Sequence, residues 1–109
     1  MLRPRDERDL FVVANRIPVA QGHEDAFEER FEKRAKTVDQ REGFVRLEVL
    51  RPVDADHYVV LTYWESEDAF EAWTQSEDFR ESHSDRPPKE MFSGKNEMES
   101  HEVIISAEK

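Results

Sequence analysis

The chain has 109 residues, a formal net charge of −10 and no cysteine. A chain of this length forms one domain, whose core is small enough that burial against a partner would help to stabilise it. Without cysteine, disulfides, thiolate catalysis and iron–sulfur clusters are excluded, and any metal must be held by histidine, carboxylate or carbonyl groups. The acidic excess repels phosphates and anionic lipid head groups, so we expect no binding to nucleic acid or membranes.

No apolar run approaches the roughly 18 residues that span a bilayer, and the opening MLRPRDERD lacks the apolar centre of a signal peptide. We therefore expect a cytoplasmic protein. Acidic residues are scattered over every segment and arginine outnumbers lysine, a pattern typical of proteins kept soluble in concentrated salt. A halophilic source is thus a hypothesis, which full stability and activity in low salt with loss of activity in molar salt would contradict.

Residues 1–9 are charged and aperiodic, so we expect a loosely ordered arm before a single domain over residues 10–109. The β-branched and apolar stretch Leu10 to Val19 predicts a first strand. Its period of two puts Asn15 on a face that is otherwise apolar. An amide there must find partners or cost about 1–3 kcal/mol. It either bonds to backbone at a bulge or points into a cavity between the sheet and the helices.

Apolar residues at helical spacing predict an amphipathic helix over Gly22 to Asp39. Arg30 and Arg34 lie four residues apart on one flank of it. They either pair with neighbouring glutamates in solvent or meet the carboxylates of a ligand that lies against the helix. Two further strands, Phe44 to Arg51 and His57 to Trp64, then form a hairpin.

Ser66 and Ser76 are each followed by Glu and Asp, the signature of a hydroxyl N-cap with an acidic first turn, so they predict the starts of two short helices. Trp73 shares the apolar face of the first helix, and His83 shares that of the second. A histidine on such a face is either a core residue with satisfied hydrogen bonds or a ligand for something held in an apolar pocket.

The polar stretch Ser84 to His101 contains Pro87, Pro88 and Gly94 and predicts a long loop, followed by a closing strand from Glu102 to Ser106. The order of elements predicts an α+β, ferredoxin-like fold, in which an antiparallel sheet carries its helices on one face. The other face needs cover, because we expect it to be apolar, and sheet-to-sheet formation of a homodimer would bury it. The residues expected there are Leu10, Val12, Ala14, Val45, Leu47 and Val49.

Several stretches resemble the antibiotic-biosynthesis monooxygenase (ABM) family of dimeric α+β barrels and, within it, the IsdG-like haem-degrading monooxygenases. The stretches cover most of Val12 to His83 and read ANRIPV, FEERFEKRAKTVDQREGF, VLRP and YWESEDAFEAWTQSEDFRESH. The most specific part is an Asn in the first strand, a Trp near the end of the first short helix and a His ten positions later.

The resemblance implies a role for each of these residues. The histidine matching His83 is the proximal iron ligand in that family, and the asparagine matching Asn15 donates a hydrogen bond on the distal side, where dioxygen binds. The tryptophan matching Trp73 presses on the porphyrin and holds it ruffled. Arg30 and Arg34 fall where the family has basic residues near the propionates. Haem b would then be both cofactor and substrate, and an unidentified reductase would supply the electrons, because the chain has no nicotinamide or flavin fingerprint.

Two alternatives stay open at this point. One is a cofactor-independent oxygenase of the same fold that acts on a polycyclic phenol or quinone, which does not need His83 as a ligand. The other is a non-catalytic dimer that binds haem or another small ligand for transfer or sensing.

Overall fold

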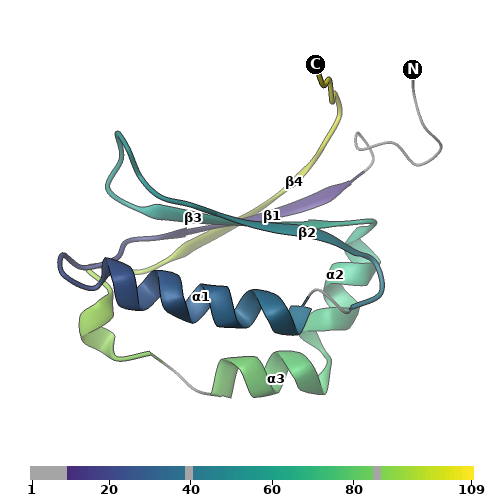
Figure 1. The fold of residues 1–109 in the computed structure, drawn as a ribbon. Helices are drawn as coiled ribbons and strands as arrows, with labels where there is room; N and C mark the ends of the chain where they lie inside the picture. The colour runs from purple at the N-terminus through teal and green to yellow at the C-terminus, as the bar shows by residue number, and fades with distance from the viewer. Residues whose placement is uncertain (1–9, 39–40, 85–86) are drawn as a thin grey trace.

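The computed structural model describes residues 10–38, 41–84 and 87–109. These residues form one antiparallel sheet in the strand order β2-β3-β1-β4, with the helices on one face (Figure 1). The predicted α+β, ferredoxin-like architecture is confirmed. In chain order the elements are β1 (Phe11–Ile17), α1 (Glu24–Val38), β2 (Phe44–Leu50), β3 (Tyr58–Trp64), α2 (Glu67–Thr74), α3 (Glu77–Ser84), the 3₁₀ turn η2 (Lys89–Met91) and β4 (Glu97–Glu102).

Hydroxyl caps start the two short helices, as the sequence predicts. The backbone N–H of Ala69 donates to Ser66 Oγ at 3.2 Å, and the N–H of Phe79 donates to Ser76 Oγ at 3.2 Å. Each bond satisfies one of the amides that a helix N-terminus leaves without an intrahelical partner. Among the described residues no helix is both long and apolar enough to cross a membrane.

The closing strand lies earlier in the chain than we expected. It covers Glu97–Glu102, so the expectation of a loop up to His101 and a strand from Glu102 to Ser106 is wrong. β4 is polar and largely exposed, and it is held by antiparallel pairing along β1, from Phe11 opposite Glu102 to Arg16 opposite Glu97. Backbone pairing to a central strand, and not its own hydrophobic pattern, therefore defines this strand.

A bulge in β2 changes which side chains face the helices. The register between β2 and β3 shifts between Phe44 and Arg46. One extra residue moves all the following side chains to the opposite face. Leu47 and Val49 therefore pack into the core under the helices, and our placement of these two residues on the outer face is wrong.

Two apolar clusters fill the space between the sheet and the helices. One lies under α1 and the other under α2 and α3. The first consists of Ile17, Phe27, Phe31, Tyr58, Val60 and Met91, with Val19, Val49 and Phe92 packed against them. The second consists of Val13, Trp64 and Trp73, with Phe11, Phe44, Leu47, Ala69, Phe70 and Phe79 packed against them.

Candidate functional site

A cavity of about 440 Å³ lies between α1, the inner face of β1 and the segment that leads into β4. Its volume is in the range of sites for small molecules. Three of the predicted site residues, Asn15, Arg30 and Arg34, line it together. The full set of lining residues is Asn15, Ile17, Phe27, Arg30, Phe31, Arg34, Pro87, Phe92, Gly94, Lys95 and Asn96.

Asn15 is half-buried on the inner face of β1, opposite Met98 of β4 and Val60 of β3. Its side-chain Oδ1 accepts a hydrogen bond from Asn96 Nδ2 at 3.0 Å. The amide is thus held by another side chain at the wall of a cavity, which is the second of the two alternatives that the sequence left open.

Arg30 and Arg34 are half-buried on α1 and both line the cavity. Burial lowers the pKa of the Arg34 guanidinium, and the neighbouring charge of Arg30 lowers it further, although the guanidinium of Arg34 stays charged at physiological pH. The Arg34 guanidinium carbon lies 4.8 Å from the centre of the Phe31 ring, within the range of a cation–π contact. With Lys95, these side chains place three cations around one cavity of an acidic protein, so the site favours a ligand with carboxylates.

Trp73 lies on α2 in the second apolar cluster and is 9% exposed. Its ring centre lies 4.7 Å from that of Phe79, edge to face, and 5.5 Å from that of Trp64. It is not among the described residues that line the cavity. The cluster includes Val13, which faces inward on β1 two residues before Asn15. Two residues span about 7 Å along a strand, so the Trp73 cluster lies next to the cavity.

The side chain of His83 is outside the described residues, and its assignment as an iron ligand stays a prediction. Its backbone belongs to α3. Pro87 follows four residues later and lines the cavity. Four residues of extended chain span at most about 14 Å, so this end of α3 lies within that distance of the cavity wall.

Five of the lining residues come from the stretch that the sequence predicts as a loop, namely Pro87, Phe92, Gly94, Lys95 and Asn96. Backbone bonds fix its centre against the end of β1, because Ser93 N–H donates to the Pro18 carbonyl at 3.0 Å. Phe92 also forms a bridge with Val19. The signal in the sequence was the apolar pair Met91 and Phe92 within a polar stretch, since such a pair returns to a core.

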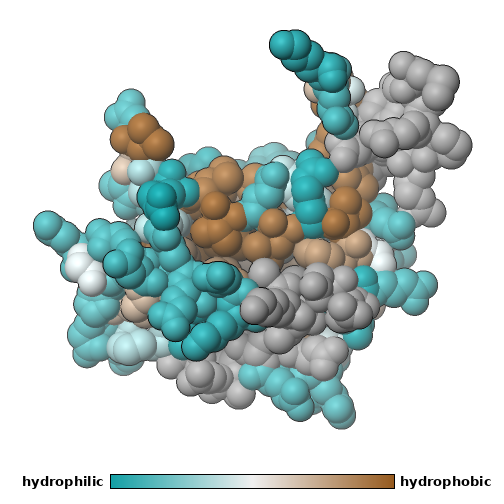
Figure 2. Space-filling view, in the orientation of Figure 1, coloured by the Kyte–Doolittle hydropathy of each residue, from teal (hydrophilic) through white to brown (hydrophobic). Residues whose placement is uncertain are grey.

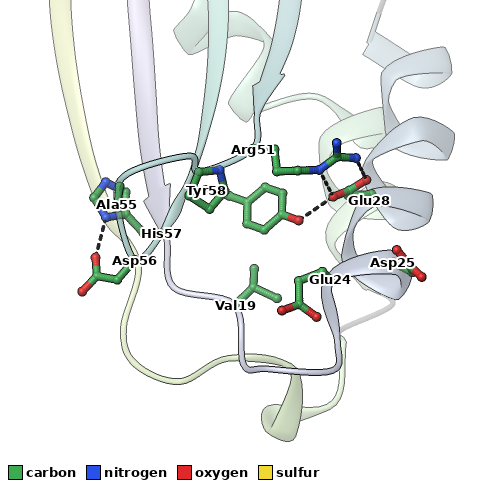
Figure 3. A pocket seen from close by; sticks show the side chains of 10 residues that line it. Val19, Glu24, Asp25, Glu28, Arg51, Ala55, Asp56, His57 and Tyr58 are labelled. Atoms are coloured by element: carbon green, nitrogen blue, oxygen red, sulfur yellow. Dashed lines mark hydrogen bonds and ion pairs between the residues drawn. The ribbon is translucent and has the colours of Figure 1, made fainter.

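A second cavity, of about 390 Å³, lies near the β2–β3 turn and is lined by acidic residues and their partners (Figure 3). Arg51 Nε donates to Glu28 Oε2 at 2.8 Å, and the Tyr58 hydroxyl donates to the same carboxylate. These hydrogen bonds, that of Arg51 first, lower the pKa of Glu28 to about 2. A carboxylate this weakly basic makes a poor general base at neutral pH, so the group acts as a structural tie.

The described residues contain no group of three or more His, Asp or Glu side chains arranged to hold a metal ion, and the side chain of His83 lies outside them. His57 instead pairs with the neighbouring Asp56, with 3.0 Å between Nδ1 and Oδ1, and this contact lowers the pKa of the Asp56 carboxyl.

The model of the antibiotic biosynthesis monooxygenase family matches residues 10–85. The chain belongs to this family. Among curated ABM relatives, a heme-degrading monooxygenase of Shouchella clausii is 35% identical over 99 residues, which cover 88% of this chain and 92% of that protein. A staphylobilin-producing heme oxygenase of Staphylococcus haemolyticus is 42% identical over 81 residues, which cover 71% of this chain and 76% of that protein.

A solved structure with the same fold is that of the heme-degrader MhuD from Mycobacterium tuberculosis, with two hemes bound in its active site. The ABM chain described here matches it with a TM-score of 0.76 at 31% sequence identity. The match covers 90% of this chain and 99% of that chain. The predicted family is thereby confirmed.

Proposed function

We propose that this ABM protein is a haem-degrading monooxygenase. It binds haem b in the cavity lined by Asn15, Arg30 and Arg34 and opens the porphyrin ring oxidatively, with dioxygen and electrons from an external donor. The observation that carries the proposal is the composition of this cavity, which combines apolar walls, three cations and one oriented amide. The haem-degrading relatives at 35% and 42% identity support the same reading.

The lining residues fit haem, which is a flat apolar ring with two carboxylates on one edge. Ile17, Phe27, Phe31 and Phe92 offer apolar surface for the ring. Arg30, Arg34 and Lys95 offer partners for the two propionates, and guanidinium groups bind carboxylates in bidentate geometry. Haem supplies the redox chemistry when it is bound. The protein's part is to hold, orient and distort it.

Each predicted site residue has a role in this proposal. His83 supplies the proximal ligand, because imidazole is a standard axial ligand of haem iron and the chain has no thiolate. Asn15 donates a hydrogen bond on the distal side. Trp73, in the cluster that adjoins the cavity, presses on the porphyrin.

Titration of the protein with haemin, followed by absorption, tests binding and ligation. We expect a saturable Soret band at about one haem per chain and its loss in His83→Ala. His57→Ala is the matched control and should keep the band, because His57 belongs to the second cavity. If the wild-type protein shows no saturable band, the haem role is wrong and the cofactor-independent oxygenase takes its place. An unchanged band in His83→Ala would contradict the proximal assignment alone.

We also propose that the protein is a homodimer in which a second copy covers the outer face of the sheet. Figure 2 shows apolar residues gathered over the middle of the sheet in that view. The chain after β4 runs away from the sheet (Figure 1) and leaves Ile104 and Ile105 74% and 80% exposed. Exposed apolar surface of this kind marks an interaction site. An electron-donating reductase, a cytoplasmic location and a halophilic source stay predictions.

A further inference from the structure

Asn96 lies directly before β4, at a position that strand register fixes relative to Asn15. Asn15 pairs with Met98 across the β1–β4 ladder. Asn96 is two residues before Met98, so it is the diagonal neighbour of Asn15 on the same inner face of the sheet. Such diagonal pairs are within reach of each other's side chains. The bridge between Val19 and Phe92 on one side and β4 on the other hold the backbone of this segment in place.

The hydrogen bond between the two amides has a direction. Asn96 Nδ2 donates and Asn15 Oδ1 accepts, at 3.0 Å. A carboxamide carries its acceptor and its two donors at opposite ends. With the oxygen of Asn15 turned towards Asn96, its NH₂ group is the end that remains for a ligand in the cavity, which both residues line.

We propose that Asn96 is a positioning residue that fixes the orientation of the Asn15 amide. Asn15 then presents hydrogen-bond donors, and not an acceptor, to the distal side of the bound haem. This inference rests on the proposed function. In the opposite orientation the Asn15 oxygen would face the distal side, where its lone pairs would repel the electron-rich group that the donors stabilise. Asn96 therefore decides whether the Asn15 amide stabilises or repels a group bound on the distal side.

Asn96→Asp tests this role, because it keeps the shape of the side chain and replaces its donor with an acceptor. The Asn15 amide should turn so that its NH₂ group donates to the new carboxylate. Ser93→Asp is the matched control: it adds the same charge three residues away, at an exposed position that does not line the cavity.

The first measurement uses the protein without haem and needs no activity. In ¹H–¹⁵N NMR spectra, Asn96→Asp should move one Asn15 side-chain amide proton downfield and slow its exchange with solvent several-fold. Ser93→Asp should leave both values unchanged. Unchanged Asn15 amide signals in Asn96→Asp would overturn the proposal.

The second measurement uses the haem complex, with carbon monoxide on the reduced iron as a probe of the distal side. A hydrogen bond donated to this probe lowers its C–O stretching frequency, so the frequency should be lower in the wild type than in Asn15→Ala. Asn96→Asp should reach or exceed the Asn15→Ala frequency while the haemin titration stays within about twofold of the wild type. Its aerobic Soret decay should slow about 10- to 100-fold, the usual cost of losing a residue that orients a ligand-contacting group.

The outcomes separate the two proposals. Suppose that the wild-type protein degrades haem and that Asn96→Asp shows the same C–O frequency and Soret decay rate. This result overturns the positioning role and leaves the proposed function intact. A wild-type protein that binds no haem overturns the proposed function, and the role of Asn96 in haem chemistry falls with it. The NMR result then still states whether Asn96 turns the amide.

Discussion

Gly43 brings the start of β2 into contact with α2. Its φ is +83°, and a Cβ at this position would lie 2.5 Å from the Cβ of Ala69. Gly22 has a similar φ of +89°, but a Cβ there would meet nothing within 4 Å. The two glycines therefore share a backbone requirement and differ in one contact.

Replacing each glycine by alanine separates these two effects. Gly43→Ala should lower the free energy of unfolding by about 2–5 kcal/mol, because a left-handed backbone costs an L-residue about 1–2 kcal/mol and overpacking adds about 1–3 kcal/mol. Gly22→Ala should cost only the backbone part, about 1–2 kcal/mol. Urea unfolding measures both, and equal losses would show that the contact with Ala69 has no energetic weight.

Trp73 needs a substitution that keeps the aromatic cluster in place. Trp73→Ala would remove the ring next to Phe79 and Trp64 and cost about 3–5 kcal/mol of stability, so any loss of activity would mix unfolding with a lost contact to haem. Trp73→Phe keeps an apolar ring there. We expect it to bind haem with an affinity within a few-fold of the wild type, to show a flatter porphyrin by resonance Raman, and to degrade haem more slowly.

Phe70→Leu is the control for this prediction. Phe70 packs in the same cluster, and its ring centre lies 6.5 Å from that of Trp73. It should lower stability without changing the porphyrin spectrum. Wild-type spectra and rates in Trp73→Phe would show that Trp73 is a core residue only.

At the scale of whole elements, Glu28 ties α1 to the sheet. Its carboxylate accepts from Arg51, which follows β2, and from Tyr58, which opens β3. The hydrogen bond from Arg51, followed by that from Tyr58, lowers the Glu28 pKa from 4.5 to about 2. A carboxyl group with a lowered pKa contributes stability above its unfolded value, and this contribution is lost as the pH falls through the folded value.

Glu28→Gln should therefore flatten the fall in unfolding free energy between about pH 4.5 and pH 2. Urea unfolding at a series of pH values measures this slope. Glu29→Gln is the control and should leave it as in the wild type, because Glu29 forms an exposed helix pair with Lys33 at 3.5 Å, and such pairs contribute little. The same slope in Glu28→Gln as in the wild type would show that the hydrogen bonds of Glu28 to Arg51 and Tyr58 do not stabilise the fold.

The sequence predicted the elements whose side chains alone define them. Alternation and hydroxyl caps placed β1, β3 and both short helices, because each is apolar or capped in its own right. The sequence could not place β4, because this strand is polar and is defined by its backbone pairing with β1. The same limit applies to the site: Asn15 was found as an odd amide on an apolar face, whereas Asn96 reaches it through a register that only the sheet reveals.

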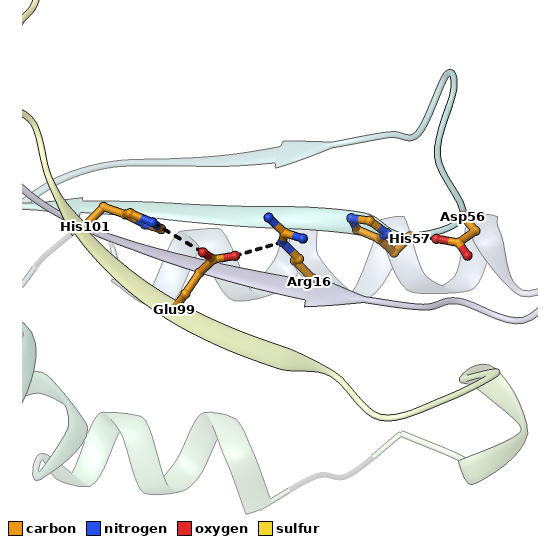
Figure 4. Close-up of polar contacts among 5 residues, drawn as sticks. All are labelled: Arg16, Asp56, His57, Glu99 and His101. Carbon is orange, nitrogen blue, oxygen red and sulfur yellow. Dashed lines mark hydrogen bonds and ion pairs between the residues drawn. The ribbon is translucent and has the colours of Figure 1, made fainter.

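At the scale of the molecule, the outer sheet face mixes apolar and charged groups. Leu61 and Tyr63 of β3 are half-buried on this face, across from Ala14 and Val12 of β1, which the chain itself already buries. Towards the β4 edge, Arg16 Nε pairs with Glu99 Oε1 at 2.8 Å, and His101 Nε2 lies 3.3 Å from Glu99 Oε2 (Figure 4). A second copy would thus meet an apolar centre with a charged margin, the usual anatomy of a protein interface.

Leu61→Arg places a charge at the centre of this face and should convert the proposed homodimer into a monomer. Light scattering coupled to size-exclusion chromatography measures the mass. Val53→Arg is the control: Val53 lies in the β2–β3 turn, is 99% exposed and should leave the dimer intact. A wild-type mass of one chain, or a Leu61→Arg variant that stays dimeric, would contradict an interface on this face.

Haem degradation itself is tested most directly by adding ascorbate in air to the haem-loaded protein and following absorption. We predict that the Soret band decays and that iron is released to a chelator, with both processes slower in Asn15→Ala than in the wild type. A Soret band that persists in the wild-type protein under these conditions would contradict the central claim and leave a haem carrier or sensor.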